Sequence, residues 1–202
     1  VMDSPHVLLV GSGAQKFALE QGLSHCSLND LMTERQYLRW KGRSEETPLE
    51  DEPRYHRREV SARPVQEEKH GTVGAVALDS LGILAAATST GGIPNKYPGR
   101  VGDSPLVGCG FYADENAAIS CTGHGEDFVR LLIAKRVADF VAFGMTARDA
   151  ATAAIAVLGV RAEGTGGLIV VDRLGNVGFA WNTENLGHAF MTEHVAEPVT
   201  GV

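Results

Sequence analysis

The sequence predicts an α+β fold in which antiparallel hairpins are covered by helices. Runs of small and β-branched residues occur in pairs separated by turn residues, which is typical of hairpins. Two longer segments between these pairs carry the apolar spacing of amphipathic helices. With 202 residues, 44% of them hydrophobic, the chain can bury one sizeable core. We therefore expect an α+β domain, with a layered αββα arrangement as its specific form.

The N-terminal part predicts a strand followed by two helices. Residues 6–10 form an apolar run of strand length, and residues 14–21 form a helix that ends at Gly22. Residues 28–40 predict a second helix, with Ser27 as its N-cap.

A charged segment separates these elements from the rest of the chain. Residues 33–69 hold 18 charged residues and three prolines but few large aliphatics, so they cannot bury enough surface to become ordered. We expect a disordered linker at about residues 41–71. The sequence after it is rich in Gly, Ala and Val and predicts a packed domain.

Three hairpins are expected after the linker. Their strands are residues 72–79 with 83–90, 108–114 with 117–123, and 167–172 with 177–182. The low polarity of the first pair predicts that both of its faces are covered.

Two helices are expected between the second and third hairpins. Residues 126–143 carry a wide apolar stripe that ends at Gly144, and Thr146 caps a helix over residues 147–158.

Composition disfavours several classes of function. The net charge is −7, which argues against nucleic acid or an anionic membrane as the main partner. The longest apolar runs are only long enough for buried strands, so we expect no membrane span. Three cysteines without a CxxC pattern predict a reducing, cytoplasmic location, and seven histidines without zinc-site spacing predict no transition metal.

Thr72 is a candidate nucleophile, because the charged segment ends at Gly71 and an apolar strand begins directly after it. A threonine hydroxyl needs a base, and cleavage of the bond before Thr72 would supply one as a new α-amine, with a pKa of about 7.7–8.0. Gly71 lets the backbone bend so that the hydroxyl can reach the preceding carbonyl carbon. The alternative is that Gly71 simply begins a strand.

Arg100 and Asp103 are candidates for binding a free α-amino acid. They lie three residues apart in a loop rich in Gly and Pro, and their opposite charges could hold an α-carboxylate and an α-ammonium group. The alternative is a local salt bridge or a turn that contributes little.

The segment SCTGHGED places Thr122, Gly123 and Gly125 between an expected strand and an expected helix. A hydroxyl and backbone N–H groups at a strand end could form an oxyanion hole. A simple strand-to-helix turn is the alternative.

Four of these segments together resemble a known family. HGTVGAVALD, AATSTGG, PGRVGDSPLVG and CTGHGE occur here in this order. They resemble the plant-type asparaginases, or isoaspartyl peptidases, of the N-terminal nucleophile hydrolase superfamily, and the resemblance covers essentially the whole chain.

The resemblance implies a precursor that cleaves itself between Gly71 and Thr72. Residues 1–71 would be the C-terminal part of an α-subunit and residues 72–202 a β-subunit, together forming one four-layer αββα sandwich. A homodimer of cleaved αβ units, a heterotetramer, is implied. The implied activity is hydrolysis of the side-chain amide of L-asparagine or of β-aspartyl dipeptides, which releases L-aspartate.

The resemblance also implies a role for each candidate residue. Thr72 would be the nucleophile and Thr90 would hydrogen-bond to it. Arg100 and Asp103 would bind the aspartyl α-carboxylate and α-ammonium groups. Thr122 and Gly123 would form the oxyanion hole, and Gly123 and Gly125 would lie beside the substrate.

The sequence departs from this family at its N-terminus. The His-Gly-Gly-Ala-Gly strand, an asparagine near the nucleophile and the alkali-metal loop of the family are not in the sequence, so we expect an N-terminally truncated chain. No cofactor is expected, although the resemblance allows a structural sodium or potassium ion near residues 3–6. The alternatives are a glycosylasparaginase-type amidase, which this chain's lack of an N-x-[ST] sequon disfavours, and an uncleaved, non-catalytic subunit or inactive fragment.

Overall fold

The structure is a computed structural model that describes residues 5–34, 36–38, 41, 71–93 and 96–202. The chain divides into two compact units, Val1–Arg57 and Arg58–Val202, and each is described by itself. Apart from its first and last residues, the linker expected at about 41–71 lies outside the described residues.

The first unit contains α1 (Gly11–Glu20) and α2 (Leu28–Leu31). Gly22 follows α1 with a φ of +80°, which confirms it as the residue that ends this helix. The expected strand at residues 6–10 is wrong: these residues have no strand conformation, and Val7 is 92% exposed. An apolar run this short becomes a strand only where another strand can pair with it.

Ser27 caps α2 as expected. Its hydroxyl accepts a hydrogen bond from the Asp30 N–H at 3.3 Å, and its own N–H donates to the Asp30 carboxylate at 2.8 Å. The length expected for this helix is wrong, because extended backbone at Met32 ends it after Leu31.

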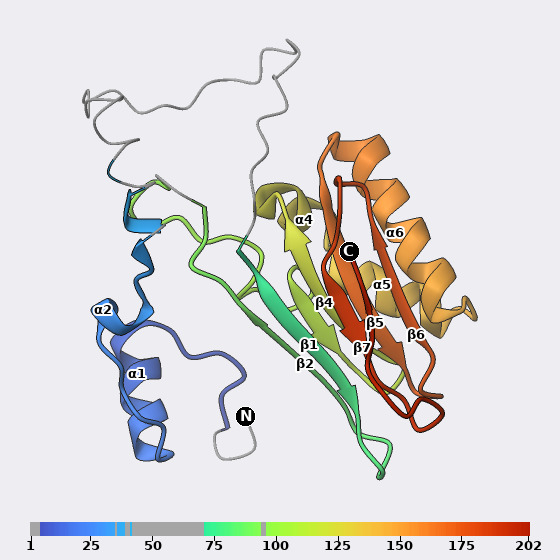
Figure 1. The fold of residues 1–202 in the computed structure, drawn as a ribbon, viewed down its shortest axis with the longest axis horizontal. Coiled ribbons are helices and arrows are strands. Elements are labelled where there is room, and N and C mark those ends of the chain that lie inside the picture. The colour runs from blue at the N-terminus through green and yellow to red at the C-terminus, as the bar shows by residue number, and fades with distance from the viewer. Residues whose placement is uncertain (1–4, 35, 39–40, 42–70, 94–95) are drawn as a thin grey trace. The chain divides into compact units, whose positions relative to one another are not determined.

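The second unit is built on an antiparallel sheet with the strand order β3-β4-β5-β6. These strands are β3 (Phe111–Ala113), β4 (Ala117–Gly123), β5 (Gly166–Asp172) and β6 (Val177–Trp181). A separate hairpin, β1 (Val73–Leu78) with β2 (Leu84–Ser89), packs on one face of the sheet, chiefly over β4 (Figure 1). All three expected hairpins are thus confirmed.

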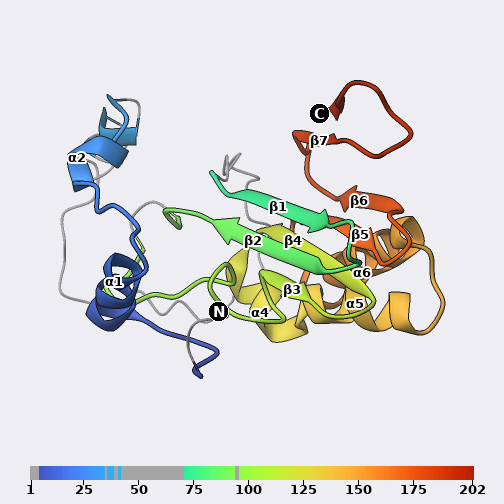
Figure 2. The same cartoon turned by 90° about the horizontal axis from the view of Figure 1, so that it is seen from below.

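Helices cover the opposite face of this sheet (Figure 2). They are α4 (Gly125–Leu131), α5 (Ile133–Ala142) and α6 (Ala147–Ala162). A further hairpin, β7 (His188–Phe190) with β8 (Val199–Gly201), follows near the C-terminus. The chain therefore has the α+β composition expected from its sequence.

The main core lies between the four-stranded sheet and its helices. Alternate residues of β4, such as Ile119 and Cys121, are buried there with Phe128 of α4, Val137 of α5 and Leu158 of α6. This burial anchors the end of β4, at Gly123, to the beginning of α4. None of the helices in the described part of the chain has the length and apolarity needed to cross a bilayer.

The single helix expected over residues 126–143 is broken at Leu132. This residue has a φ of +51° and separates α4 from α5. Leu131 and Ile133 are both buried, whereas Leu132 is 52% exposed. In a straight helix residues two apart point in different directions, so the break allows both neighbours to enter the core.

Among the residues that the structure describes, the β1–β2 hairpin is covered on one face only, which corrects the expectation that both faces are buried. Val76 and Leu78 are half-buried, whereas the alternating residues Ala75 and Ala77 are exposed. Small side chains are compatible with burial on both faces, but they do not require it.

Candidate active site

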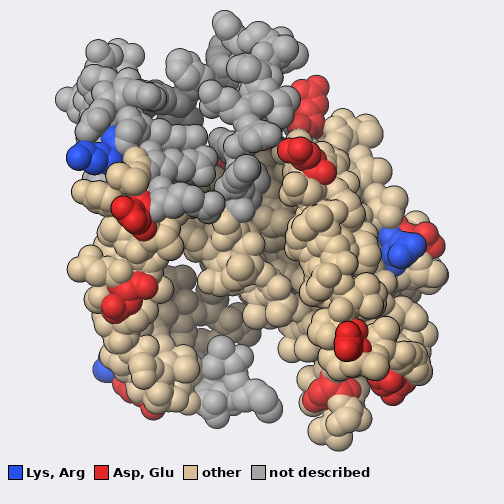
Figure 3. Space-filling view, viewed as in Figure 1, with Lys and Arg blue, Asp and Glu red and all other residues tan. Residues whose placement is uncertain are grey.

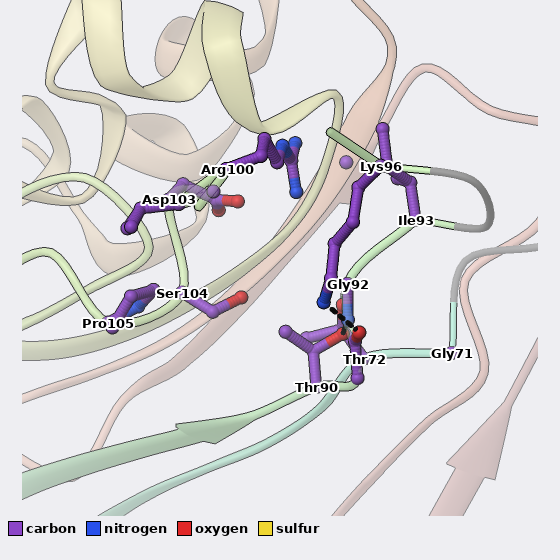
Figure 4. A pocket seen from close by; sticks show the side chains of 14 residues that line it. Gly71, Thr72, Thr90, Gly92, Ile93, Lys96, Arg100, Asp103, Ser104 and Pro105 are labelled. Atoms are coloured by element: carbon purple, nitrogen blue, oxygen red, sulfur yellow. Dashed lines mark hydrogen bonds between the residues drawn. The ribbon is translucent and has the colours of Figure 1, made fainter. Parts of the chain in front are cut away.

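A cavity of about 190 Å³ lies at the end of the β1–β2 hairpin (Figure 4). Its walls come from the residues around the first position of β1, from the end of β2, from the loop that reaches Pro105, and from Gly123 at the end of β4. The structure thus brings together six of the expected site residues from three separate segments: Gly71, Thr72, Thr90, Arg100, Asp103 and Gly123.

Thr72 and Thr90 face one another at the open end of the hairpin. Val73 pairs with Ser89, so continuing this register places Thr72 opposite Thr90. Both side chains lie together in the cavity (Figure 4). The Thr90 hydroxyl accepts a hydrogen bond from the Gly92 N–H at 3.1 Å, which fixes the turn that leaves β2.

The contact between β1 and β4 sets the position of Thr72. Gly74, two residues further along the same face of β1, lies so close to Ser120 of β4 that an added Cβ would collide with the Ser120 hydroxyl. The hydroxyls of Thr88 and Ser120 lie 2.6 Å apart, and Thr88 also donates to the Gly110 carbonyl at 3.3 Å. These polar contacts fix the hairpin on the sheet beside the cavity.

Arg100 forms an ion pair with Glu126. Its Nε and Nη2 atoms donate to the two carboxylate oxygens of Glu126 at 2.9 and 3.0 Å. The local salt bridge considered from the sequence, between Arg100 and Asp103, is not formed. The hydrogen bonds from Arg100 hold the pKa of the Glu126 carboxyl below its ordinary value.

Asp103 is buried in the cavity wall, with only 5% of its surface exposed. One of its oxygens, Oδ2, has no hydrogen-bond partner among the described residues. Burial raises the pKa of the Asp103 carboxyl, although the nearby Arg100 charge partly opposes this shift. A buried carboxylate with an unsatisfied oxygen is suited to bind a cation from solution.

Gly125 lies directly behind these two charged residues. A Cβ added to it would lie 2.8 Å from Asp103 Oδ1 and 2.9 Å from Arg100 Nη2. Gly125 does not line the cavity itself, but its missing side chain leaves the space that both groups occupy.

Of the two residues expected to form an oxyanion hole, Gly123 lines the cavity and Thr122 does not. A Cβ at Gly123 would lie 2.5 Å from the Thr165 carbonyl oxygen and 2.5 Å from the Phe128 ring, so close packing requires glycine there. Thr122 is half-buried.

Sequence reasoning missed two charged residues of this region, Glu126 and Lys96. Lys96 Nζ donates to the Gly91 carbonyl at 2.7 Å, and its side chain points toward the two threonines (Figure 4). Glu126 lies 26 residues from Arg100, and no sequence pattern links the two. The signal that could have suggested it is the pair of acidic residues that follows Gly125 in CTGHGED.

Within the described residues, no group of three or more His, Cys, Asp or Glu side chains could hold a metal ion. Asp3, in the segment where the resemblance allows an alkali-metal ion, lies outside those residues. On the face shown in Figure 3, the described Lys and Arg side chains stand apart from one another among more numerous acidic ones.

Comparison with known proteins gives consistent matches along the chain. A protein-family model described as Asparaginase matches residues 1–200. The Isoaspartyl peptidase of Salmonella typhimurium is 44% identical over 192 residues, which cover 93% of this chain and 58% of that protein. The Plant-type L-asparaginase of Pyrococcus horikoshii is 44% identical over 200 residues, covering 98% of this chain and 64% of that protein.

A mammalian relative also matches most of this chain. The Isoaspartyl peptidase/L-asparaginase of Rattus norvegicus is 41% identical over 184 residues, which cover 91% of this chain and 52% of that protein. The chain thus spans between half and two thirds of the length of these three relatives.

Proposed function

Because this chain belongs to the asparaginase family, we propose that its protein is a threonine-nucleophile amidohydrolase that first cleaves its own chain between Gly71 and Thr72. It then hydrolyses the side-chain amide of L-asparagine, β-aspartyl dipeptides, or both, and releases L-aspartate. The observation that carries the proposal is that Thr72, Thr90 and the oppositely charged residues Arg100 and Asp103 line one cavity.

Self-cleavage begins with attack of the Thr72 Oγ on the carbonyl carbon of Gly71. An ester forms as the amide bond breaks, and the nitrogen of Thr72 takes a proton and becomes a free α-amine. Water then hydrolyses the ester, which leaves a carboxylate on Gly71 and restores the hydroxyl of Thr72. A Cβ at Gly71 would meet no atom within 4 Å, so the space around the proposed cleavage site is open.

Substrate hydrolysis uses the same hydroxyl. The freed α-amine, with an unperturbed pKa of about 7.7–8.0, accepts the hydroxyl proton as Thr72 Oγ attacks the amide carbonyl. The amine returns the proton to the departing nitrogen, which leaves as ammonia or as a peptide amine. Water then hydrolyses the resulting ester and releases L-aspartate.

Charge complementarity supports the proposed substrate class. The Arg100 guanidinium binds the α-carboxylate, and Asp103 binds the α-ammonium group with its unsatisfied oxygen. Binding would therefore supply a partner for Asp103 Oδ2, which has none among the described residues. Gly123 with Thr122, in our proposal, stabilises the oxyanion, and Thr90 hydrogen-bonds to the nucleophile.

The larger assembly is part of the same proposal. Residues 1–71 act as the α-subunit portion and residues 72–202 as the β-subunit, together contributing to one αββα sandwich. Two such αβ units associate as a homodimer. We place the protein in the cytoplasm, in keeping with three free cysteines. No catalytic cofactor is needed for the proposed steps.

Paired assays test this function. The purified full-length protein is given L-asparagine, a β-aspartyl dipeptide or a glycosylated asparagine, and the release of L-aspartate is measured. We expect turnover of at least one of the first two substrates. Turnover of glycosylated asparagine alone would instead assign the glycosylasparaginase-type activity, and release of L-aspartate from none of them would contradict the proposal.

A further inference from the structure

The two charges proposed to bind the substrate, Arg100 and Asp103, do not form an ion pair with each other. Arg100 and Asp103 line the same cavity wall, and both approach the space beside Gly125. A buried carboxylate near a guanidinium gains by pairing with it, because an isolated charge is costly in a low-dielectric environment. Asp103 Oδ2 nevertheless has no hydrogen-bond partner among the described residues.

Arg100 pairs with Glu126. Glu126 binds Arg100 side-on, taking one hydrogen bond from Nε and one from Nη2. The Arg100 side chain is 15% exposed and the Glu126 side chain is 39% exposed, so solvent reaches the pair mainly from the Glu126 side. An arginine held along this edge cannot turn toward Asp103 without breaking two charge-assisted hydrogen bonds.

His124, the N-cap of α4, lies between two acidic residues of the first turn of that helix. His124 Nε2 lies 3.5 Å from Glu126 Oε2, while His124 Nδ1 lies 2.8 Å from the carboxylate of Asp127. Asp127 is buried beneath the helix, with 1% of its surface exposed. The helical turn that carries Glu126 is thus anchored by its buried neighbours Asp127 and Phe128.

We propose that Glu126 is a positioning residue that holds Arg100 away from Asp103 and so keeps both charges available to a free α-amino acid group. This inference rests on the proposed function, and it extends that function to a residue that does not line the cavity. Without Glu126, Arg100 turns to Asp103, and the site loses its preference for both the α-carboxylate and the α-ammonium group.

Substrate analogues test the proposal in the purified full-length protein. The three acyl groups are β-aspartyl, β-alanyl, which lacks the α-carboxylate, and succinyl, which lacks the α-ammonium group. Each is supplied both as the simple amide and as the amide of leucine, so that either proposed substrate class is covered. The measured quantity is the preference for the β-aspartyl compound, which is the ratio of its kcat/KM to that of each analogue.

Glu126→Gln is expected to lower the preference over the β-alanyl compound by about tenfold, because one charge-assisted hydrogen bond is lost. Glu126→Ala lowers it further and also lowers the preference over the succinyl compound. A general structural defect would instead slow all three compounds alike. Asp139→Asn is the matched control, since it removes the carboxylate of another ion pair, with Lys135, and should change neither preference.

The decisive comparison is the effect of Glu126→Gln in a protein that already carries Arg100→Met. Glu126→Gln should have no further effect on the carboxylate preference there, because its proposed action passes through Arg100. Unchanged preferences in both Glu126 variants, or a further loss in the Arg100→Met background, would overturn the inference while leaving the proposed function in place. Failure of the unmodified protein to hydrolyse either β-aspartyl compound would overturn both.

Discussion

Gly74 of β1 lies against Ser120 of β4 with no space between them for a side-chain carbon. This close approach brings the strand that begins beside Thr72 onto the four-stranded sheet. The position of the proposed nucleophile therefore depends on a glycine two residues away that has no chemical role of its own.

Replacement of this glycine should displace the nucleophile. Gly74→Ala is expected to cost about 1–3 kcal/mol of stability, because the new Cβ forces the two strands apart. It should also reduce kcat. Thermal unfolding and steady-state kinetics provide the measurements. Gly187→Ala is the control, since a Cβ there meets nothing within 4 Å. Equal effects of the two substitutions would show that the contact with Ser120 is unimportant.

Arg100→Lys should weaken catalysis because an ammonium group cannot reproduce the planar guanidinium fork. We expect a loss of about 2–3 kcal/mol, or about thirty- to two-hundredfold in kcat/KM, with self-cleavage unaffected. Turnover of analogues that lack the α-carboxylate should change little. The idea that Arg100 binds this group would be abandoned if turnover of L-asparagine and of β-aspartyl dipeptides were both unaffected.

Asp103→Asn should stabilise the folded protein at pH 7 but weaken its catalysis. Burial raises the pKa of this carboxyl, so its ionised form destabilises the folded state at neutral pH. The substitution should raise the Tm at pH 7 by an amount on the order of a few degrees. The gain should shrink as the pH falls through the raised pKa, because Asp103 itself becomes neutral there.

The same variant should bind substrate poorly, since the proposed partner of the α-ammonium group has lost its charge. We expect kcat/KM at pH 7 to fall by about tenfold or more. Thermal melts from pH 7 to pH 4, with kinetics at pH 7, make the comparison. A lower Tm at pH 7 would mean that the charge of Asp103 stabilises the fold.

Much of the secondary structure is predictable from the sequence because its signals are local. Paired apolar runs predict the three hairpins, and Ser27 and Thr146 cap helices through hydrogen bonds to backbone groups three residues away. The break at Leu132 is not predictable in this way, because the apolar stripe continues through it and tertiary packing decides the direction of the chain.

In the candidate site, too, some residues can be predicted from local sequence and others cannot. Thr72, Arg100 and Asp103 stand out because their residue types and spacing suggest chemistry. Glu126 does not, since its relation to Arg100 exists only after β4 and α4 have packed. The sequence also could not show that Arg100 pairs with Glu126 and not with Asp103, because that depends on which carboxylate the fold places against the guanidinium.

The most direct test of the account is the covalent state of the bond before Thr72. Intact mass and N-terminal sequencing of the mature, purified full-length protein should show two chains, one beginning Thr72-Val73-Gly74. The Thr72→Ala variant should remain one chain and should not hydrolyse substrate, because it has lost both the attacking hydroxyl and the freed amine. An unmodified protein that hydrolyses L-asparagine or β-aspartyl dipeptides with the bond between Gly71 and Thr72 intact would contradict the account.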